Sequence, residues 1–265
     1  MSSTINEALT IATAKIGRRD AMLLLTHATG QNSAYILLHP NENLPEYQQF
    51  FSNVERRFSG EPLQYIIGQW EFMGRVIKTD PRALIPRPET EMLVEEALKF
   101  LAPRGKGDVL DMCTGSGCIA AAVASSGPYL VTAADISADT LSLAQENGCG
   151  LNINFIQSDL FANISGQFDI IISNPPYITA QEMERLDPVV GDYEPHLALF
   201  GGTDGMDIYR QLIPESLKYL KPGGGLFLEI GPSAVTHVME ESGFTDVKLI
   251  KDYNGIDRII YGTIT

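Results

Sequence analysis

The sequence predicts an α/β protein in which a doubly wound, mostly parallel sheet follows a small helical bundle. From about residue 87 onward, segments with helical spacing alternate with short apolar runs that are typical of buried strands. A small-residue loop at residues 111–120 separates one such run from an alanine-rich helix, and Asn174-Pro175-Pro176-Tyr177 ends another. This alternation indicates parallel strands connected by helices that pack on both faces of the sheet.

The first part of the chain places apolar residues at helical spacing and predicts a small bundle. Helices are expected at residues 5–16, 21–28 and 47–58, and loops at residues 30–33 and 40–45. Apolar side chains on such helices are more often core than binding surface. The core of the bundle is therefore expected to include Leu23, Leu24, Leu25, Ile36 and Leu37.

A short hairpin is expected to link this bundle to the larger part of the chain. Its strands are predicted at residues 69–72 and 76–78, within a linking region of residues 69–85. We place the boundary between two domains at residue 75. This division predicts a helical domain of residues 1–75 and a larger domain of residues 76–265.

The larger domain contains the elements of an open sheet. A strand at residues 108–110 and a helix at residues 119–124 precede a strand at residues 129–134. Residues 221–225 are expected to form a turn into a strand at residues 226–230. Further strands are expected near residues 152 and 168, and residues 246–250 and 257–261 are expected to form a hairpin that closes the sheet with an antiparallel strand.

The loop Asp111-Met112-Cys113-Thr114-Gly115-Ser116-Gly117 is typical of a nucleotide-binding strand–turn–helix unit. Its glycines allow the backbone to approach a ligand closely, and the helix start presents unpaired N–H groups. The spacing differs from the dinucleotide pattern. An acid before such a turn favours a ligand with an amino group, such as the methionine part of S-adenosylmethionine, and Asp135 after the next strand could accept both ribose hydroxyls. A tight turn with a capping Asp is the structural alternative.

The tetrapeptide Asn174-Pro175-Pro176-Tyr177 follows the apolar residues 168–173 at the carboxyl edge of the predicted sheet, where ligands bind in open α/β folds. The prolines remove two backbone donors, so nearby carbonyls can face a ligand. An Asn amide can accept a hydrogen bond, and Tyr supplies an aromatic face. The set could hold a planar NH2 group by both hydrogens. An ordinary Asn-Pro turn is the alternative.

These motifs resemble the HemK-type protein-(glutamine-N5) methyltransferases. The resemblance covers residues 60–265 well and the first 60 residues loosely. Cys113 stands where many members carry glycine, so this position must tolerate a Cβ. Ribosomal protein L3 glutamine methyltransferases have a similar loop, whereas residues 62–66 and 86–91 favour the release-factor branch. The matching segments are residues 62–66, 71–74, 84–91, 111–120, 174–178, 194–205, 221–224 and 252–258.

The resemblance implies a class I methyltransferase-type sheet and S-adenosylmethionine as cofactor. It implies transfer of a methyl group to the glutamine of the Gly-Gly-Gln loop in class 1 peptide chain release factors, with residues 1–75 as the substrate-recognition domain. Cofactor-binding residues would be Asp111, Cys113, Thr114, Gly115, Ser116, Gly117, Asp135, Asp159, Leu160 and Asn174. Catalysis would rest on Asn174, Pro175 and Tyr177, and the substrate would contact Asn174, Pro175, Pro176 and Tyr177.

Several positions keep two interpretations. Asp159 could accept from the adenine amino group or cap a helix, while Leu160 would cover a ring face. Arg87 and Glu89 could border the cofactor mouth or form a capping ion pair. The glycine-containing residues 194–207 could form a mobile wall or a plain surface connection. Acids on the last strands, such as Glu229 and Asp257, are expected to be structural or capping.

The net charge of −14 bears on the partner. Residues 1–70 carry five basic and six acidic side chains, so nearly all of the excess negative charge lies in residues 71–265. Phosphate binding demands a basic surface, which disfavours an adenine-N6 DNA methyltransferase, although such enzymes use a similar tetrapeptide. A basic protein loop is a better partner than a naked duplex. We expect no DNA partner, no membrane partner and a monomer.

The three cysteines and four histidines do not indicate a metal site or a disulfide. The cysteines, at positions 113, 118 and 149, are odd in number and form no C-x-x-C pair. Cys118 and Cys149 are expected to be buried apolar residues. The chain start lacks a signal pattern, and no apolar stretch approaches the roughly 20 residues that span a bilayer. A reducing cytoplasm is the expected location.

Overall fold

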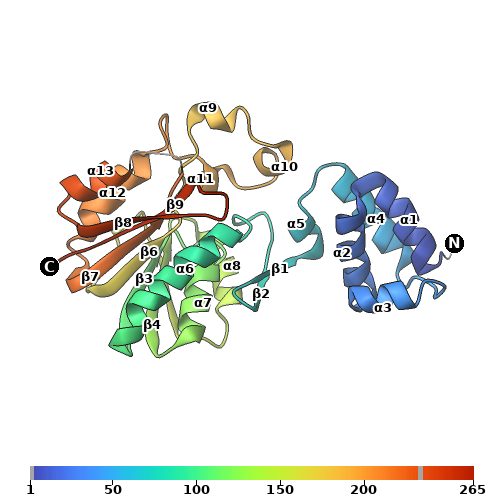
Figure 1. Cartoon of the computed structure of the whole chain (residues 1–265), viewed down its shortest axis with the longest axis horizontal. Helices are drawn as coiled ribbons and strands as arrows, with labels where there is room; N and C mark the ends of the chain where they lie inside the picture. Colours follow the sequence, from blue (N-terminus) through green and yellow to red (C-terminus); the bar gives the residue numbers. More distant parts are fainter. Residues whose placement is uncertain (1–2, 232–234) are drawn as a thin grey trace. The chain divides into compact units, whose positions relative to one another are not determined.

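The computed structural model describes residues 3–231 and 235–265. The chain divides into two compact units. The first unit ends at Gln69 and also includes Asp187–Tyr193, and the second contains Trp70–Leu186 and Glu194–Thr265. Figure 1 shows the helices of the first unit and the sheet of the second. The first unit ends a few residues before the boundary that we predicted at residue 75.

The first unit is a bundle of short helices around one apolar core. The predicted helices at residues 5–16 and 47–58 are confirmed, and the second predicted helix begins earlier, at Arg18. Thr4 and Glu7 form a capping box that defines the start of the first helix. The helices are α1 (Ile5–Ile16), α2 (Arg18–Thr29), α3 (Ser33–Leu38), α4 (Tyr47–Phe58) and α5 (Leu63–Ile67).

The core prediction for this unit is mostly confirmed. Leu24, Leu25 and Ile36 are buried, and Leu23 packs partly buried against them. The prediction for Leu37 is wrong, because 54% of its side chain is exposed. Residues 36 and 37 lie in a single helix, α3, so their side chains point in directions about 100° apart, and only Ile36 faces the bundle.

The second unit is built on a seven-stranded sheet in the order β5-β4-β3-β6-β7-β9-β8. The strands from β5 to β7 are parallel, and β9 runs antiparallel to both β7 and β8. The predicted fold class and terminal hairpin are confirmed. The strands are β3 (Gly107–Met112), β4 (Tyr129–Asp135), β5 (Ile153–Gln157), β6 (Phe168–Ser173), β7 (Leu220–Glu229), β8 (Thr245–Lys251) and β9 (Asp257–Thr263), and β1 (Gln69–Phe72) pairs with β2 (Arg75–Lys78) separately.

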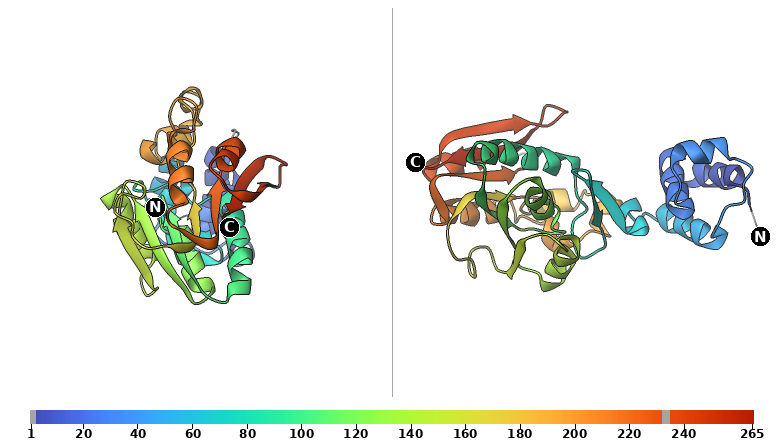
Figure 2. Two further views of the ribbon diagram at one scale, coloured as in Figure 1. Left: turned by 90° about the vertical axis from the view of Figure 1, so that its left-hand side faces the viewer. Right: turned by 90° about the horizontal axis from the view of Figure 1, so that it is seen from below.

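Helices cover both faces of the sheet (Figure 2). One apolar cluster joins α6 and α7 to one face, and a second joins α12 and α13 to the other. Ile170 and Ile172 of β6 belong to the first cluster, whereas Ile171 belongs to the second, as the twofold alternation of a strand requires. The remaining helices are α6 (Pro88–Leu101), the 3₁₀ helix η1 (Ala102–Arg104), α7 (Cys118–Ser126), α8 (Ala138–Asn147), α9 (Ala180–Met183), α10 (Pro188–Gly191), α11 (His196–Leu199), α12 (Asp207–Ser216) and α13 (Val235–Glu241).

Two further predictions are wrong. Residues 221–225, which we predicted to form a turn, belong to β7, which begins at Leu220. The stretch from Leu220 to Gly225 pairs with only residues 168–170 of β6, so β7 contains a bulge there. Cys149 is exposed, since it follows the end of α8 in a turn. Cys118 is buried, as predicted.

No helix among residues 3–231 and 235–265 has the length and apolar character needed to cross a membrane.

The strand order reverses between β3 and β6. The chain runs outward from β3 through β4 to β5, and then returns to β6 on the other side of β3. Helices that follow β3 and β6 therefore diverge to opposite faces, and a crevice opens at the carboxyl ends of these strands. The glycine loop after β3 and the Asn-Pro-Pro-Tyr segment after β6 meet at this crevice.

Candidate active site

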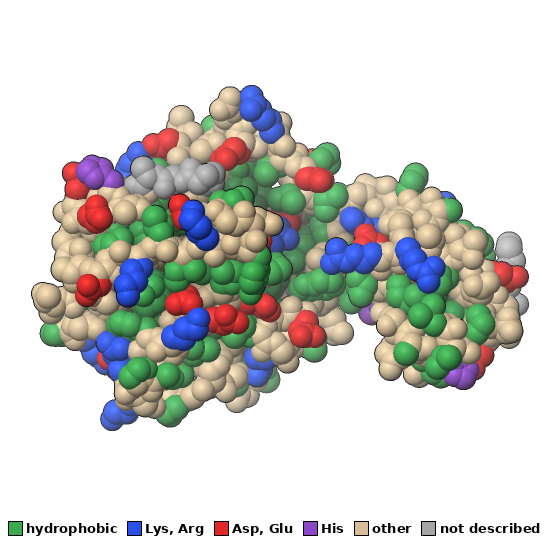
Figure 3. Space-filling model, viewed as in Figure 1, with side chains coloured by type: hydrophobic (Ala, Val, Ile, Leu, Met, Phe, Trp, Pro, Cys, Tyr) green, Lys and Arg blue, Asp and Glu red, His purple; other side chains and the backbone are tan. Residues whose placement is uncertain are grey.

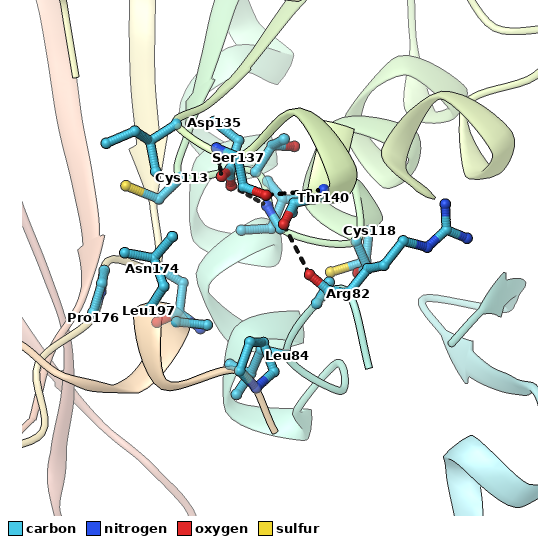
Figure 4. A pocket seen from close by; sticks show the side chains of 18 of the residues that line it. Arg82, Leu84, Cys113, Cys118, Asp135, Ser137, Thr140, Asn174, Pro176 and Leu197 are labelled. Atoms are coloured by element: carbon cyan, nitrogen blue, oxygen red, sulfur yellow. Dashed lines mark hydrogen bonds between the residues drawn. The ribbon is translucent and has the colours of Figure 1, made fainter. Parts of the chain in front are cut away.

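A cavity of about 480 Å³ lies at the carboxyl ends of the central strands. This volume lies within the range of roughly 300–1,000 Å³ that is common for small-molecule sites. In Figure 4, Asn174 and Pro176 lie on one side of the cavity, and Asp135, Ser137 and Thr140 lie on the other. Predicted site residues that line it are Cys113, Thr114, Gly115, Ser116, Asp135, Asp159, Leu160, Asn174 and Pro176.

Asp111 does not line this cavity, although it was predicted to contact the cofactor. One of its carboxylate oxygens accepts the Thr114 hydroxyl at 2.5 Å and the Ala120 N–H at 3.0 Å. The side chain thus caps the first turn of α7 and holds the loop closed. Burial raises the pKa of Asp111 to about 7, against the effect of these hydrogen bonds. Its contact with a methionine ammonium group stays a prediction.

Cys113 adopts a backbone conformation that normally favours glycine. Its φ is +61°, in the left-handed region. The side chain lines the cavity, and burial raises the pKa of its thiol to about 12, with a further contribution from the charge of Asp135. The thiol is therefore protonated at neutral pH and is not a nucleophile. The resemblance had indicated that this position must tolerate a Cβ, and the structure shows the strain that this involves.

Asp135 is held by the glycine loop and by its own helix start. The Gly115 N–H donates to one carboxylate oxygen and the Ser137 N–H to the other, both at 3.0 Å. Each oxygen can accept a further hydrogen bond. Burial raises the pKa of Asp135, while the backbone hydrogen bonds oppose this rise. A carboxylate that is fixed in this way suits two vicinal hydroxyls, such as those of a ribose.

The segment after β5 supplies another wall of the cavity. Asp159 and Leu160 both line it, and Leu160 has a φ of +43°. Ser158, which sequence reasoning missed, is 2% exposed and donates from its hydroxyl to the Leu160 carbonyl at 2.6 Å. This bond holds the turn that presents Leu160 to the cavity. The hydroxyl of Thr140 closes another side by donating to the Arg82 carbonyl at 2.8 Å (Figure 4).

The Asn-Pro-Pro-Tyr segment presents different residues to different surroundings. Asn174 and Pro176 line the cavity, whereas Pro175 is buried behind them. The Asn174 amide donates through Nδ2 to the Thr90 hydroxyl oxygen at 3.2 Å. Tyr177 does not line the cavity, and its hydroxyl donates to Glu229 at 3.3 Å. The predicted stacking of Tyr177 on a substrate amide stays a prediction.

Glycines of residues 194–207 pack against this segment. A Cβ on Gly201 would lie 2.6 Å from the Tyr177 Cα, and a Cβ on Gly205 would lie 2.3 Å from the Tyr177 carbonyl oxygen. Backbone hydrogen bonds join Ile178 to residues 199 and 201, both at 2.9 Å. The glycine content of this segment therefore reflects close packing behind the Asn-Pro-Pro-Tyr backbone.

Glu194 ties the segment at residues 84–87 to the same wall. Its side chain is 1% exposed, forms an ion pair with Arg87 and accepts the Ile85 N–H at 3.0 Å. Arg87 also lines the cavity, as one of our two interpretations expected for it, whereas its ion-pair partner is Glu194, more than 100 residues away in the sequence, and not Glu89. Sequence reasoning missed Glu194, because only the fold brings these segments together.

Comparison with known proteins identifies the family. Residues 6–68 match the PrmC N-terminal domain, and residues 89–187 match the methyltransferase small domain. The chain is 44% identical over 254 residues to the release factor glutamine methyltransferase of Koribacter versatilis, with 92% of this chain and 90% of that protein covered. The chain belongs to the release factor glutamine methyltransferase family.

Other relatives support this membership and the fold of the second unit. The release factor glutamine methyltransferase of Geobacter sulfurreducens is 44% identical over 218 residues, which cover 80% of this chain and 76% of that protein. A solved T. thermophilus 16S rRNA N2 G1207 methyltransferase, in complex with AdoMet and guanosine, shares the fold with a TM-score of 0.55 at 20% identity. That match covers 74% of this chain and 50% of the solved one.

For a methyltransferase of this family, the cavity residues fit S-adenosylmethionine. The paired carboxylate oxygens of Asp135 are free to accept from two ribose hydroxyls, and the loop from Cys113 to Ser116 could supply a close backbone surface. Leu160 and Ile136 provide apolar contacts for a planar base. The wall formed by Asn174 and Pro176 faces the same space, so a group held by Asn174 would lie beside a cofactor in this cavity (Figure 4).

Glu229, which we expected to be structural or capping, is a buried partner of the residues beside Asn174. It is 1% exposed at the end of β7, and it accepts hydrogen bonds from Thr90 at 2.6 Å and from Tyr177 at 3.3 Å. An isolated acid at the end of an apolar strand gives only a weak sequence signal. Its connection to Asn174, through Thr90, appears only when α6, β6 and β7 are brought together.

Proposed function

We propose that this enzyme transfers a methyl group from S-adenosylmethionine to N5 of the glutamine in the Gly-Gly-Gln loop of class 1 peptide chain release factors. The observation that carries the proposal is the arrangement of Asn174. Its amide nitrogen is held by Thr90, so its carbonyl oxygen is available to a planar NH2 group beside the cavity that Asp135 lines. The family membership supports the choice of substrate.

Amide nitrogen is a poor nucleophile because its lone pair is delocalised into the carbonyl group. S-adenosylmethionine supplies a methyl group on a good leaving group, so orientation of the amide provides much of the rate. The Asn174 carbonyl oxygen accepts one hydrogen of the target NH2 group, and the Pro175 carbonyl accepts the other. The two acceptors aim the nitrogen at the methyl group and stabilise its developing positive charge.

The proton of the methylated amide leaves to water after transfer, so the reaction requires no dedicated general base. Tyr177 contributes an aromatic face at the substrate side of the segment. Cys113, Thr114, Gly115 and Ser116 surround the methionine and ribose portions of the cofactor, together with Asp135, whereas Gly117 does not line the cavity and is the N-cap of α7. Asp159 and Leu160 border the adenine.

The partner is a protein loop, and residues 1–75 contact the body of the release factor at a distance from the site. Nearly all of the net charge of −14 lies in residues 71–265, which suits a basic loop better than a nucleic acid. On the face shown in Figure 3, Lys and Arg side chains of the larger unit are interspersed with Asp and Glu. The enzyme acts as a monomer in the cytoplasm, where release factors function.

A methyl-transfer assay with labelled S-adenosylmethionine tests this function. The acceptors are a purified release factor, its Gly-Gly-Gln variant with Gln replaced by Ala, ribosomal protein L3 and duplex DNA. We expect one methyl group on the release-factor glutamine, located by peptide mass mapping, and none on the variant. Label on L3 or DNA instead would overturn the substrate assignment.

The assignment of Asn174 needs its own variant. Asn174→Ala should bind S-adenosylhomocysteine normally in calorimetry and lose about 100-fold or more in turnover, as expected when an oriented polar contact to the reacting group is removed. Near-normal turnover with intact cofactor binding would show that Asn174 does not hold the target amide.

A further inference from the structure

Four side chains from three parts of the fold form one hydrogen-bonded network at the cavity wall, and two of them, Thr90 and Asn174, line the cavity. Thr90 lies in the first turn of α6, Glu229 ends β7, and Asn174 and Tyr177 follow β6. Thr90 and Glu229 are 3% and 1% exposed. The Thr90 hydroxyl donates to Glu229 Oε2 at 2.6 Å, and the Asn174 Nδ2 donates to Thr90 Oγ1 at 3.2 Å.

The direction of these hydrogen bonds determines how the Asn174 amide is oriented. An ionised carboxylate only accepts, so Glu229 takes the single hydrogen of the Thr90 hydroxyl. The lone pairs of Thr90 Oγ1 remain, and they can only accept from Asn174. The Asn174 NH2 group therefore faces Thr90, and its carbonyl oxygen faces the opposite side.

The opposite amide orientation would place two acceptors against each other. The carbonyl oxygen of Asn174 would then face Thr90 Oγ1, whose hydrogen is engaged with Glu229, and a buried acceptor would lack a donor. The same flip would present NH2 rather than a carbonyl oxygen to the substrate. An NH2 group cannot accept a hydrogen from the target amide, so the orientation decides whether the site can hold its substrate.

We propose that Glu229 and Thr90 are positioning residues that fix the Asn174 amide so that its carbonyl oxygen faces the substrate. The inference rests on the proposed function, since it concerns how that site orients the target amide. Glu229 acts through Thr90, and Thr90 acts through Asn174. The Tyr177 hydroxyl occupies the second carboxylate oxygen, Oε1, and leaves Oε2 directed at Thr90.

The ionisation of Glu229 depends on its surroundings. Burial raises its pKa to about 7, whereas the hydrogen bonds from Thr90 and Tyr177 and the charge of Arg258 oppose the rise, and the charge of Glu89 adds to it. Kinetics at pH 8.5 therefore examine the enzyme with Glu229 mostly ionised, the state in which it only accepts.

The test compares Thr90→Val, Thr90→Ser, Glu229→Gln and the double variant Thr90→Val/Glu229→Gln at pH 8.5. The substrates are labelled S-adenosylmethionine and purified release factor. Thr90→Val should lower kcat by about 10- to 100-fold, the size expected when a reacting group is misplaced, with KM for S-adenosylmethionine within about threefold of wild type. Thr90→Ser keeps the hydroxyl and should recover most of kcat.

Glu229→Gln can reverse the direction of the hydrogen bonds that link residue 229, Thr90 and Asn174. Its side-chain NH2 can donate to Thr90, whose hydroxyl is then free to donate to the Asn174 carbonyl, so kcat should fall while cofactor binding persists. Because Glu229 acts through Thr90, the double variant should lose no more activity than Thr90→Val alone. Additive losses in kcat would overturn the proposed order of action.

A matched control removes a buried hydroxyl elsewhere. Ser216 is fully buried in the last turn of α12 and donates to the Ile213 carbonyl at 2.7 Å. Ser216→Ala should retain wild-type kcat. If Thr90→Val does not fold, as judged by circular dichroism, Thr90→Ser and Glu229→Gln still decide the proposal, because full activity of Glu229→Gln would overturn it.

The outcomes separate this inference from the function itself. If wild type methylates release factor and the variants do so equally well, the network has no positioning role while the proposed function stands. If wild type methylates a different acceptor, the proposed function fails, and the variants are compared on that acceptor. Losses that appear in cofactor KM, with kcat unchanged, would also overturn the positioning role.

Discussion

At the scale of single residues, the site combines common chemistry with one strained position. Asp135 and Asn174 line the cavity, as predicted. Each forms a hydrogen bond with a residue from another part of the sequence, and this bond orients its side chain. Cys113 is different, because it occupies a left-handed backbone conformation without being glycine. For a residue with a Cβ, this conformation costs roughly 1–2 kcal/mol.

Cys113 provides a direct test of this strain. Glycine removes the left-handed penalty but loses more backbone entropy on folding, so Cys113→Gly should change stability little. Cys113→Ala keeps the penalty and loses the sulfur contacts, and should be less stable than Cys113→Gly by about 1 kcal/mol. Urea denaturation of both variants measures the difference. Greater stability of the alanine variant would show that the φ of +61° is not maintained in solution.

At the scale of elements, the segment of residues 194–207 packs as a support for the Asn-Pro-Pro-Tyr segment. Gly201 and Gly202 are buried, and Gly201 donates to the Ile178 carbonyl. The isolated bridge between Ile178 and Phe200 adds to this contact. Movement of this segment when substrate binds stays a prediction, and its glycines are explained by how closely it approaches Tyr177.

A pair of glycines separates contact from backbone strain. Gly205 has a φ of +74°, and a Cβ there would lie 2.3 Å from the Tyr177 carbonyl oxygen. Gly255 has a φ of +80°, and a Cβ there would meet nothing within 4 Å. Both alanine variants share the left-handed penalty, so Gly205→Ala should be the less stable by at least about 1 kcal/mol, because overpacking typically costs 1–3 kcal/mol.

The same pair should differ in activity. Gly205→Ala displaces the backbone of Tyr177 and should lower kcat, whereas Gly255→Ala should keep it. Thermal denaturation and the methyl-transfer assay provide both readouts. Equal stability of the two variants would mean that residues 194–207 yield to the added methyl group, and that their packing does not define the position of Tyr177.

At the scale of the whole molecule, two buried acids connect stability to pH. Burial raises the pKa values of Asp111 and Glu229 to about 7. An acid whose pKa is raised on folding contributes stability below its unfolded pKa, and this contribution is lost as the pH rises through the folded pKa. Acids with lowered pKa values, such as Asp80 and Asp204, act in the opposite sense, at pH values near and below 4.

We therefore expect the protein to be less stable at pH 8.5 than at pH 6. Each buried acid should contribute about 1 kcal/mol to this difference, from the portion of its titration that lies between these pH values. Urea denaturation at the two pH values measures it. Glu229→Gln and Asp111→Asn should each reduce the difference, and a wild type with equal stability at both pH values would contradict the raised pKa values.

The sequence by itself was sufficient for the fold class, the order of the strands along the chain, the glycine loop, Asp135 and Asn174. These features depend on local patterns, since hydrophobic periodicity defines the elements and strand ends place polar residues at one edge of a parallel sheet. The same reasoning failed for Leu37 and Cys149, because burial depends on which face of an element meets the core.

Only the tertiary structure decided the hydrogen-bond partners of the residues around Asn174. Asn174 and Glu229 lie 84 and 139 residues from Thr90 in the sequence, and no local pattern relates the three residues. The same holds for Arg87 and Glu194. Hydrogen-bond orientation arises from atoms that meet when distant elements pack. The chemical type of a site side chain can therefore be predicted from the sequence, whereas the fold determines its hydrogen-bond partners and its orientation.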